Sequence, residues 1–447
     1  MHCLIPRFVL LVALAAGCAP EVDREPPHMV VVLVDQLRKD VADRSMPRTR
    51  ALAERGVIFD NARSAAPWTY PSVVSMFSGL YPQEHGATDS DDGTELTYFS
   101  RDVPLVQRIL TSAGYHAAGF VANPFLGTWN PFHEDFSHYD VSFVNDHGNW
   151  RDGGTKAHRE QRKGQTAWTD RMWGDNLNRA VREHYDERAL AEPELTYVHY
   201  IDVHGRRQGQ ARWETAPFDG DLSSACEFVD DCIVELYDYF AERYAGSMIF
   251  LVTSDHGEAH GDDEEIGYGK QFRRKKRTVH DFNLRIPLWV LESQHLPAAR
   301  TVDEAVSNID IASTLLDLAG LPQPAPMRGR SLVPTFEGHS TGPARPLYAR
   351  SDGFRVENDC VVWENNKLLR HFDLGTHEIV GQRIFDLEHD PRETISSEAN
   401  PDLNATLETL VGQEARGAGI FPSSYTKPDG STLEALKAIG YGGGDGD

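Results

Sequence analysis

The sequence MVVVLVDQ at residues 29–36 is a continuous apolar run that ends directly on Asp35 and Gln36. Valine favours strands, and a strand without polar alternation is typical of a parallel sheet covered on both faces. Similar runs, separated by helical patterns, recur at residues 117–121, 195–201, 248–252 and 287–291. This alternation predicts an α/β fold in which a large, mostly parallel sheet lies between helices.

Composition bounds the class of protein. The 447 residues are 40% hydrophobic and 25% charged, which is enough to bury a large core. The 68 acidic residues exceed the 44 basic ones, for a formal net charge of -24. We therefore expect no nucleic-acid partner, and an anionic substrate would need a local positive site, such as the basic residues between 270 and 277.

The N-terminus has the pattern of a targeting segment. Arg7 precedes a short apolar run at residues 8–16, and small residues then lead into Cys18. This pattern predicts a lipoprotein-type signal peptide at residues 1–17, with Cys18 as the lipid-bearing first residue of the mature protein. We expect an exported protein, anchored to a membrane of the cell envelope through Cys18, with ordinary secretion as the alternative.

Polar residues follow three of the predicted strands. Asp35 ends the first, His204 follows the run at 195–201, and Asp255 with His256 follows the run at 248–252. Ligands of open α/β sheets gather at the carboxyl ends of the strands. A mixture of carboxylates and imidazoles suits a hard or borderline divalent cation, although one acidic residue after a strand is more often a helix cap.

Thr69 lies in the segment APWTYPSV at residues 66–73. Pro71 and the apolar residues after it predict a short helix that ends at Gly79. A hydroxyl at the start of this helix would lie near unsatisfied backbone amides, which favour anions. The alternative is that Thr69 is only an N-cap.

The C-terminal part predicts a second, smaller layer. Strand-like segments at residues 360–363, 367–371 and 383–387, with turns between them, indicate a small antiparallel sheet backed by a helix at 403–410. We therefore expect a main domain at residues 28–345, a small subdomain at 346–415 and a tail at 416–447.

Several motifs in this chain resemble one family in content and in order. They are VVLVDQLRKD (31–40), LAERGVIF (52–59), SGLYPQEHG (78–86), TSDHG (253–257), LRIP (284–287), NIDIASTLLDLAGL (308–321) and IFDLEHDPRET (384–394). Together they are similar to the sulfatase branch of the alkaline phosphatase superfamily, from about residue 29 to 410. The resemblance implies an alkaline-phosphatase-like sandwich with a small C-terminal antiparallel sheet.

The resemblance also implies a metal site. It carries Asp35, Asp255 and His256 over as ligands of one divalent ion, with Thr69 at the nucleophile position beside that ion. The pairs Asp35-Gln36 and Asp255-His256 resemble those of phosphonate monoester hydrolases and phosphodiesterases more than those of arylsulfatases. The ion expected is Ca²⁺, or one of the Mn²⁺ and Zn²⁺ class.

Other residues carry substrate roles by the same resemblance. His204 looks like the family histidine that contacts the substrate or protonates the leaving oxygen, and Lys270 resembles the lysine that clamps the anion. Gln36 and His280 are candidates for substrate binding. A third histidine common in sulfatases is either replaced by Tyr268 or supplied by His280.

Two departures from the family pattern bear on the substrate. Sulfatases carry a cysteine or serine at position 69, which becomes formylglycine, and usually an arginine at position 73; here the residues are Thr69 and Val73. Threonine cannot form that aldehyde, so we expect no formylglycine. The sequence therefore predicts a hydrolase of sulfate esters or of phosphate and phosphonate esters, acting on a substrate such as a sulfated glycan or a phosphodiester. The alternative is a catalytically inactive surface lipoprotein that binds sulfated or phosphorylated ligands.

Overall fold

A computed structural model describes residues 26–90, 95–141, 173–204, 217–218, 221–259, 277–352, 357–397, 400–416, 419–426 and 436. The predicted signal peptide, Cys18 and Lys270 lie outside these ranges. Among the described helices, none combines the length and the apolar character needed to cross a membrane.

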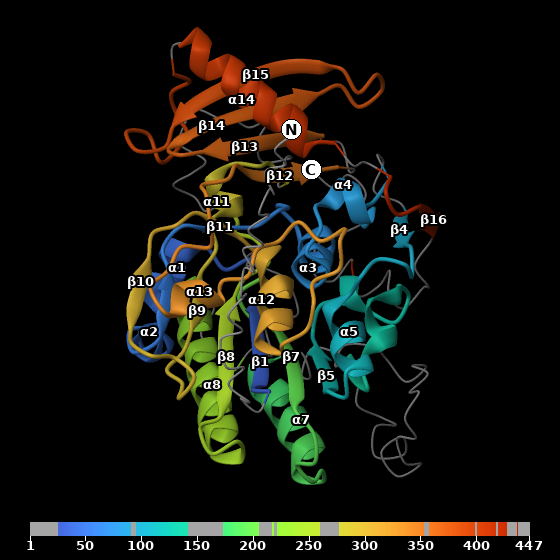
Figure 1. Cartoon of the computed structure of the whole chain (residues 1–447), viewed down its shortest axis with the longest axis vertical. Helices are drawn as coiled ribbons and strands as arrows, with labels where there is room; N and C mark the ends of the chain where they lie inside the picture. The colour runs from blue at the N-terminus through green and yellow to red at the C-terminus, as the bar shows by residue number, and fades with distance from the viewer. Residues whose placement is uncertain are drawn as a thin grey trace, which may run out of the picture.

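The main sheet has eight strands in the order β10-β2-β9-β8-β1-β7-β5-β6 (Figure 1). Their bounds are β1 His28–Val34, β2 Val57–Phe59, β5 His116–Val121, β6 His138–Val141, β7 Glu194–Tyr200, β8 Met248–Thr253, β9 Leu288–Val290 and β10 Arg300–Val302. All neighbours pair in parallel except β9, which runs antiparallel to both β2 and β8. The predicted mostly parallel sheet is confirmed, and the run at 287–291 is its antiparallel member.

Two groups of helices cover this sheet. The first contains α1 Lys39–Ser45, α2 Pro47–Ala53, α7 Gly174–Asp186 and α8 Leu222–Arg243. The second contains α3 Thr69–Ser78, α5 Val106–Ser112 and α12 Asp310–Leu318. Every residue of β5, β7 and β8 is buried, as expected for central strands with both faces covered. Short connecting elements complete this part: β3 Ala62–Arg63, β11 Val306–Ser307, α4 Pro82–His85, α11 Asp281–Leu284, α13 Val333–Phe336, and the 3₁₀ turns η1 Pro124–Leu126 and η2 Pro131–Asp135.

The C-terminal subdomain is a four-stranded antiparallel sheet backed by one helix. Its strands follow chain order: β12 Leu347–Ser351, β13 Asn358–Trp363, β14 Asn366–Phe372 and β15 Ile379–Asp386. Helix α14 Pro401–Glu414 packs on β13 and β14. Figure 1 shows this subdomain, in orange and red, above α3 and α11. The small antiparallel sheet predicted from the sequence is confirmed.

A buried ionic cluster joins the subdomain to the main domain. Lys367 of β14 is fully buried, and its Nζ lies 2.9 Å from Oδ1 of Asp281 and 2.7 Å from Oε1 of Glu393. Arg63 approaches the other oxygen of Asp281 at 2.7 Å. Charges buried this deeply are stable only when they are paired, so the cluster fixes how the two parts dock.

Part of the expected tail is ordered. Residues Ser423–Thr426 form β16, which pairs antiparallel with β4 Leu96–Phe99. The predicted domain bounds stay a prediction, but this part of the predicted tail is a paired strand. The physical reason is that Tyr and Thr favour strands and that β4 offers an open edge for pairing.

Candidate metal-dependent active site

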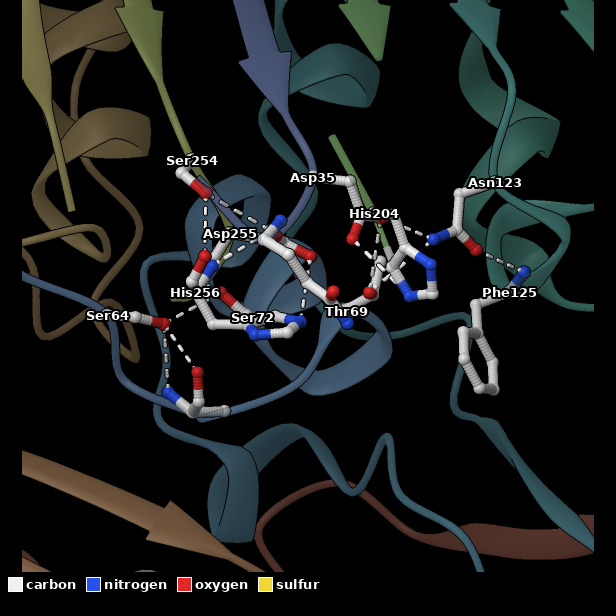
Figure 2. A network of polar contacts seen from close by, with 12 residues as sticks. Asp35, Ser64, Thr69, Ser72, Asn123, Phe125, His204, Ser254, Asp255 and His256 are labelled. Carbon is white, nitrogen blue, oxygen red and sulfur yellow. Dashed lines mark hydrogen bonds and ion pairs between the residues drawn. The ribbon is translucent and has the colours of Figure 1, made fainter. Parts of the chain in front are cut away.

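Adjacent strands bring the polar residues together. Strand β1 lies between β7 and β8 and pairs in parallel with both, so the carboxyl ends of all three meet at one edge of the sheet. Asp35 follows β1, Asp255 follows β8, and His204 lies just beyond β7. Figure 2 shows these side chains with Thr69 in one cluster. The three strand ends thus converge as the sequence predicts, and the roles of these residues stay a prediction.

Asp35 is the centre of the cluster and is fully buried. Its Oδ2 accepts hydrogen bonds from Nδ2 of Asn123 at 2.5 Å and from Oγ1 of Thr69 at 3.4 Å, and it lies 3.0 Å from Nε2 of His199. Its Oδ1 lies 3.8 Å from Nε2 of His204. Burial opposes the charged form, but the attraction of His204 and the hydrogen bond and charge of His199 hold the pKa of Asp35 well below its usual range.

Asp255 directs one oxygen into the protein and the other into the site. Its Oδ1 accepts from the backbone N–H groups of Gln36 at 3.0 Å and His256 at 2.8 Å. Gln36 adopts a left-handed conformation with φ 60°, a strained geometry that aims its N–H at this carboxylate. Oδ2 has no hydrogen-bond partner among the described residues. Burial and repulsion from Asp35 raise the pKa of Asp255, which a bound cation would reverse.

His256 is oriented as a ligand would be. Its Nδ1 lies 2.6 Å from the carbonyl oxygen of Gly257, so Nδ1 carries the proton and Nε2 keeps its lone pair. Nε2 lies 3.5 Å from Oδ2 of Asp255 and has no hydrogen-bond partner in the described part of the chain. A Cβ on Gly257 would lie 2.2 Å from the carbonyl oxygen of Phe282, so this turn requires glycine.

The donor set fits a divalent cation. Ligand atoms of Asp35, His199 and Asp255 all lie within 4.8 Å of one another, and all three residues are buried. Oδ1 of Asp35 and Oδ2 of Asp255 have no hydrogen-bond partner within the described ranges. Two desolvated carboxylates facing each other need a compensating positive charge. This group contains His199 and not His256, so the ligand set of Asp35, Asp255 and His256 stays a prediction.

Thr69 is the first residue of α3, and Trp68 occupies the N-cap position. The interpretation of Thr69 as an N-cap is therefore wrong: its hydroxyl points to Asp35 and not to the amides of its own helix. Val73 and Thr69 are both fully buried. Gly79 ends the helix in a left-handed conformation, as predicted.

A hydrogen-bond network fixes α3 against the Asp255 loop. Ser72 Oγ donates to the carbonyl oxygen of Asp255 at 2.6 Å, and Nδ2 of Asn308 donates to Ser72 Oγ at 2.9 Å. Ser64 Oγ lies 2.9 Å from Ser72 Oγ. Figure 2 shows Ser64, Ser72 and Asp255 in this network. The position of Thr69 is thus set by buried side chains and not by a mobile loop.

Comparison with protein families agrees with this architecture. The model of the family described as sulfatase matches residues 27–321. The chain belongs to the sulfatase family. A second family model, described as the C-terminal part of N-sulphoglucosamine sulphohydrolase, matches residues 270–415 of the chain.

Individual relatives of this sulfatase-family chain are distant. A Delta 4,5-hexuronate-2-O-sulfatase from Bacteroides thetaiotaomicron is 23% identical, with 86% of this chain and 87% of the relative covered. A solved structure of a protein in complex with its substrate D-glucosamine-2-N,6-O-disulfate has a TM-score of 0.65 at 15% identity, covering 88% and 98% of the two chains. A phosphonate monoester hydrolase from Silicibacter pomeroyi has a TM-score of 0.63 at 17% identity, covering 87% and 94%. The two structures show a shared fold.

Two residues of the site were missed by the sequence analysis of this sulfatase-family chain. Asn123 follows β5 by two residues, so the strand-end rule that identified Asp35 could have found it. His199 lies inside β7, where its ring joins Tyr197 Oη at 2.9 Å to Asp35. Its imidazole in a mostly apolar run, which also contains Thr196, was a weak sign of it.

The remaining predicted residues differ in their surroundings. His204 is 1% exposed and lies beside Asp35. His280 is the N-cap of α11; its Nδ1 lies 3.0 Å from Oγ1 of Thr278, and its ring packs against Phe282 and, in the C-terminal subdomain, Phe385. Its role in substrate binding stays a prediction. Lys270 and Tyr268 lie outside the described residues.

Proposed function

We propose that this sulfatase-family chain is a metal-dependent hydrolase of phosphate or phosphonate esters, with the Thr69 hydroxyl as the nucleophile. The observation that carries the proposal is the contact between Oγ1 of Thr69 and Oδ2 of Asp35, at 3.4 Å. On this proposal, an unmodified hydroxyl takes the place of the formylglycine of the family. The chemistry open to a hydroxyl therefore selects the substrate.

The proposed reaction has two transfers. Oγ1 of Thr69 attacks phosphorus and its proton passes to solvent, while the bond from phosphorus to the ester oxygen breaks and that oxygen leaves as the alcohol with a proton from a general acid. Water then attacks the phosphorylated or phosphonylated threonine, the phosphorus–Oγ1 bond breaks, and a proton from that water returns to Thr69 as phosphate or phosphonate leaves. Asp35, with its pKa held low, is a weak base for this hydroxyl, so ionisation of Thr69 depends on positive charge nearby. A divalent ion held by Asp35, Asp255 and His256 would supply that charge and would polarise the ester.

Two neighbouring side chains have roles in this scheme. His204 lies 3.8 Å from Asp35 and is the candidate donor of a proton to the leaving oxygen. Asn123 donates to Asp35 and lies 3.5 Å from Oγ1 of Thr69. Its amide therefore orients both the carboxylate and the nucleophile.

Phosphorus is favoured over sulfur because of the second step. Formylglycine hydrate expels sulfate by collapsing to the aldehyde, a route that threonine lacks. A threonine sulfate would need a second attack at sulfur, whereas cationic groups stabilise the in-line transfer of a phosphoryl group. The phosphonate monoester hydrolase from Silicibacter pomeroyi, with its similar fold, supports this choice.

Sulfate-ester hydrolysis is the second candidate. The relative from Bacteroides thetaiotaomicron is named a Delta 4,5-hexuronate-2-O-sulfatase, and the similar solved structure holds D-glucosamine-2-N,6-O-disulfate as its substrate. On this reading the substrate is a sulfated glycan, and Thr69 orients a water molecule for direct attack.

A matched panel of substrates separates these candidates. Aryl phosphate, aryl phosphodiester, aryl phosphonate and aryl sulfate are each incubated with wild type, Thr69→Ser and Thr69→Ala in the presence of Mn²⁺, Zn²⁺ or Ca²⁺. The proposal expects turnover of a phosphorus ester that Thr69→Ser retains and Thr69→Ala loses. Turnover of the sulfate alone supports the second candidate. Silence on all four by a protein that binds the ion contradicts both, and it favours a binding lipoprotein.

The location of the enzyme is also a proposal. The predicted signal peptide and Cys18 indicate export and a lipid anchor on a cell-envelope membrane. Mass spectrometry of the purified N-terminal peptide tests this, because wild type should carry a lipid on Cys18 and Cys18→Ser should not.

A further inference from the structure

Three histidines gather at the opposite end of the sheet from Asp35. His116 begins β5 and His138 begins β6. The parallel register pairs His138 with Ala118, which lies two residues after His116. Residues two apart on a strand share a face, so His116 and His138 project from the same face of adjacent strands.

Helix α7 brings in the third histidine. His184 lies in the last turn of α7, and its Nε2 is 3.0 Å from Nε2 of His116. The ring of His138 stacks on the ring of His184, with centroids 4.1 Å apart and an angle of 23° between the planes. Three imidazoles from a helix and two strands thus lie against one another.

The spacing of the two nitrogens is that of two ligands on one ion. A Zn–N distance of about 2.0–2.1 Å, with angles of roughly 90–110°, puts two coordinating nitrogens roughly 2.9–3.4 Å apart. Without an ion, the two neutral rings share one N–H between these nitrogens, and a transition metal would engage both lone pairs.

The charges around the histidines and the type of ligand they offer both bear on which ion would bind. The C-terminal end of α7 favours a cation, and the buried carboxylate of Glu194 is close enough to stabilise positive charge on His116. Arg188 and Arg243 oppose it. A hard ion such as Ca²⁺ prefers oxygen ligands, whereas imidazole suits Zn²⁺, Ni²⁺ and Cu²⁺.

We propose that His116 and His184 bind a borderline transition-metal ion of the Zn²⁺ class at a second site, with His138 as the third ligand after a change of rotamer. The site is separate from the Asp35 cluster, because His116 lies at the amino end of β5 and Asn123 lies beyond its carboxyl end. A bound ion would join edge strand β6 to β5 and α7 and so stabilise this edge of the sheet.

Zinc stoichiometry tests the proposal. Metal-free full-length protein is titrated with Zn²⁺ by isothermal calorimetry, and metal content after gel filtration is measured by mass spectrometry, for wild type, His116→Gln, His184→Gln and His389→Gln. His389 is the control because its side chain is 78% exposed and lies in the C-terminal subdomain. We expect His116→Gln and His184→Gln each to bind one Zn²⁺ fewer than wild type and to lose the part of the Zn²⁺-dependent rise in Tm that this ion causes.

The control and the fold are checked in the same samples. Circular dichroism in the absence of metal confirms that each variant is folded, and His389→Gln should match wild type in stoichiometry and Tm. Two outcomes overturn the proposal. One is equal Zn²⁺ stoichiometry in wild type and both cluster variants. The other is loss of one Zn²⁺ in His389→Gln as well, which would mark the binding as nonspecific.

Discussion

Asn123→Ala tests whether the amide beside Asp35 supports the reaction. The substitution removes the hydrogen bond from Nδ2 to Oδ2 of Asp35, at 2.5 Å, and the longer contact with Thr69. A hydrogen bond to a charged group contributes about 1.5–3 kcal/mol. If that stabilisation is present in the transition state, kcat/KM falls by about 10- to 150-fold. Steady-state hydrolysis of the substrate with the highest turnover in the panel measures the change.

Asn130→Ala is the matched control for this experiment. Asn130 and Asn123 each precede a proline and cap a 3₁₀ turn. The side chain of Asn130 accepts a hydrogen bond from the backbone N–H of Phe132 at 3.0 Å, and that of Asn123 accepts one from the backbone N–H of Phe125 at 2.9 Å. Both are buried, but Asn130 donates to backbone carbonyls and not to Asp35. We expect Asn130→Ala to lower thermal stability while kcat/KM stays within about twofold, well under the effect of one such bond. Equal losses of kcat/KM in the two variants would refute the role of Asn123.

Three further predictions concern the ionic cluster and the metal. Lys367→Met removes the cation that Asp281 and Glu393 share, and at about pH 8, above the pKa of Glu393, it should lower the free energy of unfolding in urea by about 3–5 kcal/mol. Adding Glu393→Gln should recover part of this, and no recovery would argue against the pairing. Burial raises the pKa of Glu393 from 4.5 to about 7 despite the attraction of Lys367. A raised carboxyl pKa contributes stability that is present below pH 4.5 and is lost as the pH rises through 7. The free energy of unfolding of wild type should therefore fall by about 3 kcal/mol relative to that of Glu393→Gln across this window. A difference between the two proteins that does not change with pH would contradict the assignment. Removal of divalent ions with a chelator should lower the Tm of wild type, and Mn²⁺ or Ca²⁺ should restore it. The same ions should not restore the Tm of Asp255→Asn. Restoration in that variant would show that the ion binds at another site.

The strands that could be predicted from the sequence are those that lie in a continuous apolar run. The run at 29–34 reads as a strand because both faces of β1 are covered, and the same reasoning found β5, β7, β8 and β9. The short strands β2, β6 and β10 have three or four residues, too few for a periodic pattern. The order of the sheet depends on pairing between distant segments, which a local pattern does not contain.

The candidate site was predictable for the same reason. Asp35 and Asp255 end long apolar runs, and parallel strands bring such ends together. His199 was missed because its contact with Asp35 depends on β7 lying next to β1. The histidine cluster at His116 and His184 was missed because its members come from different elements, 68 residues apart in the chain.

A covalent intermediate on Thr69 is the most direct test of the proposed reaction. Excess enzyme, loaded with its preferred ion, is mixed with the best phosphorus ester and quenched in acid within one turnover, and the peptide containing Thr69 is sequenced by mass spectrometry. We expect a phosphoryl or phosphonyl group on Thr69 that forms and decays at rates compatible with turnover and is absent from Thr69→Ala. Full hydrolysis with no modification of Thr69 at any time, or retained hydrolysis by Thr69→Ala, would contradict it.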